Sequence, residues 1–371
     1  MKEIHIVIEA SIPYLRGAIE QMGHVTYLPS GDFTNETVRD ADWLIIRSIT
    51  KITPELLEGS RVRLITTATI GFDHIDTGYC SSHGITWFNA PGCNAGGVGQ
   101  YFASWVSLLA LRGEIKPEEM TIGIIGAGNT GKEVQRFASA LGMRVLLNDP
   151  PRAEKEGASG FVPIETVARE ADIIEFHVPL TKTGAHPTYH LLDEALVQKL
   201  ARKPIVANLC RGPVTKTEAL LEGLRTDQIS RLVIDCWEGE PEISRPLLEA
   251  AEIATPHIAG FSAEGKRRGA YVCAEHGATF FGLPMPAIEE PPMPSAPLID
   301  LSDVHGRDQV YHALLCTFDP RRPDRLLRDH TGDFERLRKS YEYPREAPAF
   351  TVSGADPDFA PILKAIGFKV I

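Results

Sequence analysis

Short apolar runs rich in β-branched residues alternate with longer segments of helical periodicity along most of this chain. A first series of such runs occupies residues 4–8, 25–28, 43–47, 63–67 and 85–88. A second series occupies residues 121–126, 143–149, 171–178, 204–210 and 232–238. Strand-like runs separated by helix-like segments are typical of βαβ units and a parallel sheet. We therefore expect an α/β fold with two doubly wound parallel-sheet domains.

A helix-like segment separates the two series. The later part of residues 94–113 is expected to be helical, although Gly96, Gly97 and Gly99 each weaken a helix by about 1 kcal/mol relative to alanine. Either close packing or an interdomain hinge would account for these glycines.

The last quarter of the chain has a different pattern. Residues 284–297 are dense in proline, which disfavours helices and central strands, so we expect a linker. Beyond it, residues 298–371 combine a strand-like run at 310–318 with a charged helical segment at 333–342. We expect a small α+β domain there, which is a candidate for oligomerisation.

Composition narrows the class of protein. The 371 residues are 43% hydrophobic and 23% charged, as in ordinary globular proteins. The formal charge of −11 and the lack of a long basic run argue against binding to nucleic acid or to an anionic membrane surface. An anionic substrate would therefore need a local cluster of positive side chains.

Cysteine and histidine usage argues against a metal site. The six cysteines form no CxxC pair, which favours reduced thiols over a disulfide framework or a zinc site. His177, His186 and His190 are close in sequence, but their spacing fits no familiar ligand pattern. The first residues, MKEIHIVIEA, lead directly into a strand-like run, and no apolar run is long enough to span a bilayer. We expect a cytoplasmic protein without a metal.

The sequence GAGNTG at 126–131 lies between a strand-like and a helix-like segment. In that setting a GxGxxG motif predicts dinucleotide binding: Gly126 makes the tight turn, Gly128 admits the pyrophosphate and Gly131 lets helix and sheet pack closely. Asp149 ends the next strand, where an acid would bind the adenosine ribose and repel a 2′-phosphate. This favours NAD over NADP, although Arg152 would weaken the preference and Asp149 equally suits a turn.

Three polar residues lie at or just beyond the ends of successive strand-like stretches of the second domain, the last of them after EIATP (252–256). They are Arg211, Glu240 and His257. Ligands of open α/β sheets bind at the carboxyl ends of the strands, so these side chains are expected to converge. Oxidation of a 2-hydroxy acid needs a base for the hydroxyl proton, a cation for the carboxylate and a hydride acceptor, and histidine, arginine and NAD meet these needs.

The roles within this set leave alternatives open. Glu240 would raise the pKa of His257 and orient its ring, but Glu238 and Glu242 compete for that role. A single histidine in an apolar segment is more often a packed core residue, so the catalytic interpretation of His257 rests on its partners.

This combination resembles the D-isomer-specific 2-hydroxyacid dehydrogenases. The resemblance implies a flavodoxin-like substrate-binding domain (1–93 and 258–283), a Rossmann NAD-binding domain (94–257) and, after the linker, a C-terminal dimerisation domain (298–371). Arg211, Glu240 and His257 take the catalytic places, with His257 as proton donor and acceptor. The implied cofactor contacts are Gly126, Gly128, Asn129, Thr130, Gly131, Asp149, Val178, Asp235 and Gly260. The implied substrate contacts are Ser48, Thr69 and Phe261.

Some of these positions also suit a purely local role, and some depart from the family pattern. Ser48 and Thr69 are equally suited to local turn or cap hydrogen bonds, and Asp235 could be a buried carboxylate held by backbone donors. Phe261 stands where a substrate-contacting tyrosine is expected, and Val178 where a threonine is expected to touch the cofactor.

Further segments are similar to the members of this family that oxidise 4-phospho-D-erythronate in pyridoxal 5′-phosphate synthesis. They are RSITK (47–51), TATIGFDHID (67–76), APGCNA (90–95), DCWEGEPE (235–242) and GDFERLRKSYEYPRE (332–346). The implied product is (R)-3-hydroxy-2-oxo-4-phosphobutanoate. The alternatives are a dehydrogenase for 3-phosphoglycerate or another D-2-hydroxy acid, and an NAD-sensing interaction protein. The candidates for binding the substrate phosphate are Arg47, Lys51, Lys266, Arg267 and Arg268.

Overall fold

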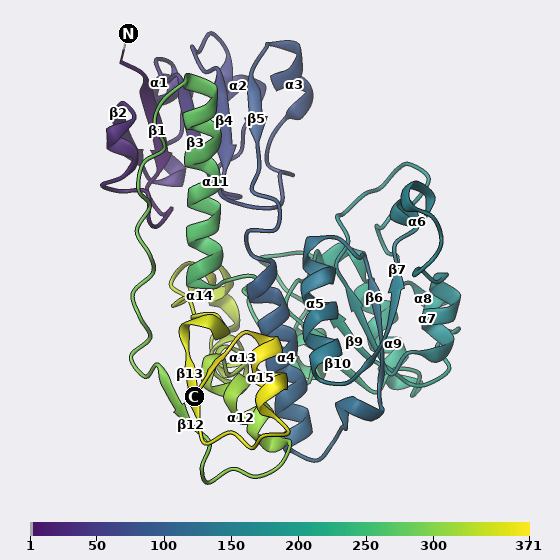
Figure 1. Cartoon of the computed structure of the whole chain (residues 1–371). Coiled ribbons are helices and arrows are strands. Elements are labelled where there is room, and N and C mark those ends of the chain that lie inside the picture. The colour runs from purple at the N-terminus through teal and green to yellow at the C-terminus, as the bar shows by residue number, and fades with distance from the viewer. Residues whose placement is uncertain (1–2) are drawn as a thin grey trace. The chain divides into compact units, whose positions relative to one another are not determined.

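A computed structural model describes residues 3–371 (Figure 1). By its internal contacts the chain forms two compact units, residues 1–94 with 262–292 and residues 95–261 with 293–371. The predicted division into three domains and a linker stays a prediction. None of the described helices is long and apolar enough to cross a bilayer.

The first unit is built on a five-stranded parallel sheet in the order β2-β1-β3-β4-β5. This is the flavodoxin-like order, as expected. Its strands are β1 His5–Glu9, β2 His24–Leu28, β3 Trp43–Ile46, β4 Leu64–Thr67 and β5 Thr86–Phe88. Its helices are α1 Asn35–Val38, α2 Pro54–Leu57, α3 Thr77–Ser82 and α11 Ala263–Phe281, with short 3₁₀ helices at Ile19–Gln21 and Ser30–Asp32.

Helices cover both faces of this sheet, because consecutive residues of its central strands are buried. Successive strand residues point to opposite faces, so Ile6 joins the core beneath α11 while Val7 joins the core beneath α1, α2 and α3. Figure 1 shows α11 running across one face of the sheet. A Cβ on Gly277 of α11 would lie 2.0 Å from the indole of Trp43, so glycine there allows this close approach.

The second unit contains a six-stranded parallel sheet in the order β11-β10-β9-β8-β6-β7. Its strands are β6 Thr121–Ile125, β7 Arg144–Asn148, β8 Ile173–Phe176, β9 Ile205–Asn208, β10 Arg231–Ile234 and β11 Ile253–Ala254. The order reverses between β6 and β8, which is the switch point where doubly wound sheets bind ligands. Val162 donates its backbone N–H to the Leu147 carbonyl, so the chain runs beside β7 where the Rossmann order places a further strand.

Helices flank this sheet and connect its strands. They are α4 Ala95–Leu111, α5 Asn129–Ala140, α6 Pro150–Glu156, α7 Ile164–Glu170, α8 Glu194–Val197, α9 Thr217–Arg225 and α10 Arg245–Ala250, with 3₁₀ helices at Pro117–Glu119 and Gly212–Val214. Close packing accounts for a glycine of α4: a Cβ on Gly99 would lie 2.7 Å from the Phe137 ring of α5.

The C-terminal residues of the same unit form a three-stranded parallel sheet and four α-helices. The strands, in the order β12-β13-β14, are Leu298–Asp300, Thr351–Ser353 and Lys369–Val370. The helices are α12 Asp308–Thr317, α13 Arg321–Asp329, α14 Phe334–Lys339 and α15 Ala360–Ile366, with 3₁₀ helices at Thr331–Asp333 and Ala347–Ala349.

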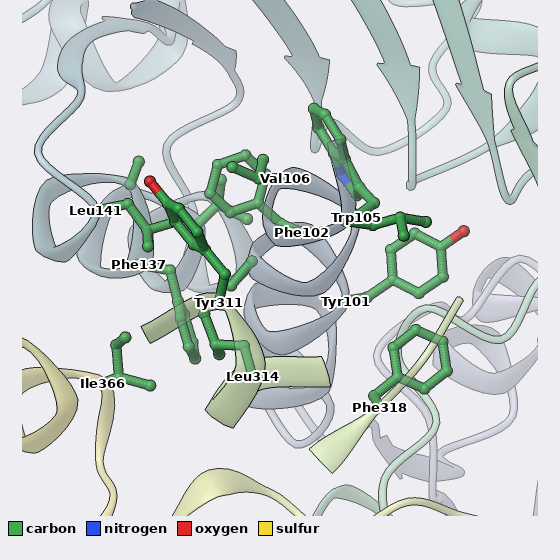
Figure 2. Close-up of a cluster of buried hydrophobic side chains, with 14 of the residues drawn as sticks. Tyr101, Phe102, Trp105, Val106, Phe137, Leu141, Tyr311, Leu314, Phe318 and Ile366 are labelled. Atoms are coloured by element: carbon green, nitrogen blue, oxygen red, sulfur yellow. The ribbon is translucent and has the colours of Figure 1, made fainter. Parts of the chain in front are cut away.

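The strand predicted at 310–318 is wrong, because this segment forms α12. Its buried side chains recur with helical spacing and pack against α4. Figure 2 shows Tyr311 and Leu314 of α12 in one apolar cluster with Phe102 of α4 and Phe137 of α5. The C-terminal part and the second sheet therefore share a continuous core.

Candidate active site

The glycine-rich turn joins β6 to α5, as the motif predicted. Gly126 has φ +93°, and a Cβ there would lie 2.6 Å from the His177 carbonyl oxygen. A Cβ on Gly131 would lie 2.1 Å from the Gly126 carbonyl oxygen. At Gly128, which caps α5, a Cβ would meet no protein atom within 4 Å. Close backbone contacts therefore require glycine at positions 126 and 131. Gly128 instead leaves space at a helix N-terminus, where an anion can approach. Asn129 and Thr130 form the first turn of α5.

Asp149 braces this turn from the end of β7. One carboxylate oxygen accepts a hydrogen bond from Ala127 N at 2.9 Å. The other accepts from Arg152 N at 3.1 Å, so Asp149 also caps the N-terminus of α6. Arg152 donates to the Ala127 carbonyl and to both oxygens of Glu156. Three of the five N–H donors of Arg152 are engaged within the protein, which leaves fewer for a 2′-phosphate. The turn role considered for Asp149 is present, and it is compatible with a ribose contact.

Asp235 is a buried carboxylate whose oxygens are satisfied by the loop after β11. It accepts from Thr255 Oγ1 at 2.6 Å, Ile258 N at 2.7 Å and Ala259 N at 2.9 Å. Burial raises its pKa, an effect that the charge of His257 and these hydrogen bonds oppose. Asp235 thereby holds the loop that carries His257 and Gly260.

Val178 lies beside the glycine-rich turn, next to Gly126.

His257 has φ +56°, an uncommon backbone conformation for a side-chain-bearing residue. Its backbone N–H donates to the Asp235 carbonyl at 2.8 Å, and the Asp235 side chain binds the next two amides. A strained conformation of this kind costs about 1–3 kcal/mol and persists where the surroundings enforce it. The backbone of His257 is therefore held in place by Asp235.

Glu240 is the carboxylate that pairs with His257. Its Oε2 lies 2.8 Å from His257 Nδ1, and its Oε1 accepts from Trp237 N at 2.7 Å. Glu238 instead binds His190 at 2.6 Å and Thr217 N at 3.0 Å, and Glu242 is exposed. The choice among the three acids, which the sequence left open, is made by tertiary contacts.

The electrostatics of Glu240 favour its charged form. Burial would raise its pKa, but the charge of His257, the hydrogen bonds from His257 and Trp237 and the charge of Arg338 lower it overall. A negative carboxylate on Nδ1 makes that nitrogen the N–H donor, which leaves Nε2 of His257 to accept a proton.

Arg211 lies directly beyond β9, two places from β11 in the sheet order. Its Nη1 donates to the Cys210 carbonyl at 2.8 Å, and the side chain is half-buried. A Cβ on Gly212 would lie 1.9 Å from the Trp237 carbonyl oxygen, so the loops after β9 and β10 touch. The residues after β9, β10 and β11 thus lie at one edge of the sheet, as predicted.

Ser48 and Thr69 follow β3 and β4 of the first unit. Ser48 is exposed, whereas Thr69 Oγ1 donates to the Gly71 carbonyl at 2.9 Å and lies 2.7 Å from Thr67 Oγ1. The local turn bonds considered for Thr69 are therefore present. Of the basic candidates in this unit, Arg267 binds Glu290 and the Glu289 carbonyl.

The described residues contain one group of three metal-ligating types whose ligand atoms lie within 4.8 Å of one another, namely Cys236, Glu240 and His257. Two of its members form the histidine–carboxylate pair described above. His177, His186 and His190 do not form a cluster. His186 pairs with Glu154, and His190 pairs with Glu238. The prediction that the protein uses no metal stays a prediction.

A buried acid and histidine at the end of β8 were not anticipated from the sequence. Glu175 Oε1 and His177 Nε2 are 3.6 Å apart, and both side chains are 0% exposed. Neither has a hydrogen-bond partner among residues 3–371. Burial raises the pKa of Glu175 well above its usual value and lowers that of His177 to about 3. The sequence signal that could have indicated this pair is EFH (175–177), in which charged and polar residues interrupt an apolar strand.

Comparison with known proteins identifies the family. The family model described as "D-isomer specific 2-hydroxyacid dehydrogenase, NAD binding domain" matches residues 103–259. An erythronate-4-phosphate dehydrogenase of Porphyromonas gingivalis is 51% identical over 98% of this chain and 99% of its own length. The chain belongs to the D-isomer-specific 2-hydroxyacid dehydrogenases. An erythronate-4-phosphate dehydrogenase of Bacteroides thetaiotaomicron is 49% identical to this dehydrogenase over 94% of the chain and 99% of its own length.

Solved structures agree on the fold of this dehydrogenase. The NAD⁺-bound 3-phosphoglycerate dehydrogenase of Entamoeba histolytica matches with a TM-score of 0.64 and 24% identity, over 75% of this chain and 96% of its own. The D-lactate dehydrogenase of Aquifex aeolicus, complexed with NAD and lactic acid, matches with a TM-score of 0.60 and 23% identity over the same shares. The α/β fold and the predicted NAD cofactor are confirmed, the cofactor by the family's NAD-binding domain in residues 103–259.

Proposed function

We propose that this dehydrogenase oxidises 4-phospho-D-erythronate to (R)-3-hydroxy-2-oxo-4-phosphobutanoate with NAD, as a step of pyridoxal 5′-phosphate synthesis. The observation that carries the reaction class is the hydrogen bond between His257 Nδ1 and Glu240 at the carboxyl edge of the NAD-binding sheet. The substrate is proposed from the nearly full-length relatives that bear the name erythronate-4-phosphate dehydrogenase.

The chain's own residues perform the proton chemistry. NAD, when bound at the N-terminus of α5, would supply the acceptor for the hydride from C2 of the substrate. Neutral His257 takes the proton of the C2 hydroxyl on Nε2 while Nδ1–H donates to Glu240, so the hydroxyl becomes a carbonyl and the imidazole an imidazolium. Arg211 binds the substrate carboxylate, for which its planar guanidinium is suited. In reduction, the imidazolium returns the proton.

The cofactor and substrate positions in the implied set are part of this proposal. Gly128, Asn129 and Thr130 offer the N-terminus of α5 to the pyrophosphate, with Gly126 and Gly131 shaping the turn. Asp149 contacts the ribose, and Val178, Asp235 and Gly260 line the nicotinamide end. Ser48, Thr69 and Phe261 contact the substrate.

Substrate comparison tests the proposal. Oxidation of 4-phosphoerythronate, erythronate and 3-phosphoglycerate is measured with NAD, with a 2-oxo acid acceptor added so that bound cofactor is recycled. A kcat/KM highest for 4-phosphoerythronate is expected. Preference for 3-phosphoglycerate would keep the dehydrogenase and replace its substrate, whereas NAD binding without turnover of any acid would favour the sensor role.

We also propose a cytoplasmic homodimer assembled through residues 298–371. The six cysteines are free thiols, which suits a reducing compartment. Light scattering after size exclusion is expected to give twice the chain mass of 40.7 kDa, and the monomer mass would contradict it. Deletion of the C-terminal part is not a usable control, because it shares a core with the second sheet.

A further inference from the structure

The C-terminal part of the chain reaches the catalytic loop within the second unit. The ring of Phe261, four residues after His257, lies 5.9 Å from that of Tyr343 and 6.3 Å from that of Tyr341. The guanidinium carbon of Arg338, in α14, is 5.9 Å from the Phe261 ring centroid. Two tyrosines and an arginine from the last forty residues therefore surround Phe261.

Arg338 brings positive charge to the catalytic pair. It is among the groups whose charge acts on Glu240, after that of His257. The side chains of Arg338, Glu240 and His257 keep similar partial exposures of 20%, 21% and 26%. All three are thus recessed but accessible to a small molecule.

The hydrogen-bonding capacity of Arg338 is underused. Its Nε is buried and has no hydrogen-bond partner among residues 3–371, and its Nη1 lies 3.9 Å from Glu335, beyond hydrogen-bond distance. Two positions earlier on the same helix, Arg336 is 60% exposed and paired with Asp333. A buried guanidinium donor without a partner is costly, so its retention points to an anionic ligand.

The substrate proposed above has two anionic ends, a carboxylate and a phosphate. Arg211 serves the carboxylate, and a chain with a net charge of −11 must hold the phosphate with local positive charge.

We propose that Arg338 binds the phosphate of the substrate, in the same active site as Arg211, Glu240 and His257. The C-terminal part then supplies a specificity-determining residue in addition to its packing role. Arg338 would join or replace the five basic residues of the first unit considered as phosphate ligands. This inference rests on the proposed function for the identity of the substrate, although not for the presence of the anion site.

The test compares Arg338→Met with Arg336→Met, a matched change on the same helix. For Arg338→Met, we expect kcat/KM for 4-phosphoerythronate to fall about tenfold to a hundredfold, chiefly through KM, as for loss of a charged hydrogen bond. The change for unphosphorylated erythronate should be much smaller, and Arg338→Lys should recover part of the loss. Arg336→Met should behave as the unaltered enzyme.

A merely structural role for Arg338 predicts a different result. If it only supports Phe261 or the charge of Glu240, both substrates lose kcat equally and the pH profile of kcat shifts, which would overturn the proposal. Far-UV circular dichroism and the thermal midpoint establish that each variant is folded.

A binding measurement separates this proposal from the proposed function. Inorganic phosphate is titrated against the NAD-bound enzyme at constant ionic strength, with the thermal midpoint as readout. Stabilisation of the unaltered enzyme and of Arg336→Met, but not of Arg338→Met, is expected even if 4-phosphoerythronate is not oxidised. Equal stabilisation of all three proteins, or of none, would refute the phosphate site at Arg338.

Discussion

Replacement of Glu175 by glutamine should change how the stability of this protein depends on pH. Glu175 is 0% exposed and has no hydrogen-bond partner among the described residues, so burial raises its pKa well above the usual 4.5. In the unfolded chain this carboxyl is ionised above pH 4.5, whereas in the folded protein it keeps its proton up to its raised pKa. Its stabilising contribution is therefore present below pH 4.5 and is lost as pH rises toward the folded pKa.

The neighbouring histidine acts in a different pH range. Burial lowers the pKa of His177 from 6.5 to about 3, so the unfolded state binds one more proton between these values. Its contribution to stability is lost as pH falls from 6.5 to 3. Glu175→Gln keeps His177, so the difference between the two proteins isolates Glu175. While Glu175 is protonated in the folded state and ionised in the unfolded state, this difference changes by up to about 1.4 kcal/mol per pH unit.

The assay is urea unfolding of the unaltered protein and Glu175→Gln at several pH values, followed by circular dichroism. Above pH 4.5 and below the folded-state pKa of Glu175, the free energy of unfolding of the unaltered protein should fall relative to Glu175→Gln, by up to about 1.4 kcal/mol per pH unit. Glu165→Gln, which removes an exposed carboxyl 57% accessible to solvent, is the control for the loss of charge itself. Parallel curves for the unaltered protein and Glu175→Gln would show that Glu175 is already ionised in the fold, and would refute the reasoning.

Three further predictions concern the active site. His257→Ala should lower kcat about a hundredfold to ten-thousandfold with NAD affinity retained, because the general base is lost; normal turnover in a folded variant would exclude this role. Direct titration should show NAD binding at least about tenfold tighter than NADP, because Asp149 faces the turn and Arg152 is engaged; equal affinities would contradict it. Gly131→Ala places a Cβ 2.1 Å from the Gly126 carbonyl, so chemical denaturation should show a loss of about 1–3 kcal/mol and NAD affinity should fall; an unchanged variant would disprove the packing argument.

The sequence determined the features that depend on neighbouring residues. Short apolar runs rich in β-branched residues, alternating with helix-like segments, predicted both parallel sheets because helices cover both faces of such a sheet. The GAGNTG motif predicted the turn before α5 because Gly126 and Gly131 are demanded by local backbone geometry. The loops that carry Arg211, Glu240 and His257 were predicted to lie at one edge of the second sheet because parallel strands end at the same edge.

Other features were decided only by contacts between distant parts of the chain. The apolar run at 310–318 is compatible with a strand by composition, and it became α12 because a helical face of it packs on α4. Glu240, rather than Glu238, faces His257 because Glu238 is bound by His190, forty-eight residues away.

Arg338 reaches the catalytic loop by the same kind of long-range contact. More than seventy residues separate it from His257, and no local pattern relates the two. Its place depends on the shared core of α4, α5 and α12 and on the packing of Phe261 against Tyr341 and Tyr343. Local backbone geometry depends on short stretches of neighbouring residues. Which residues form this site depends instead on which surfaces pack together when the whole unit folds.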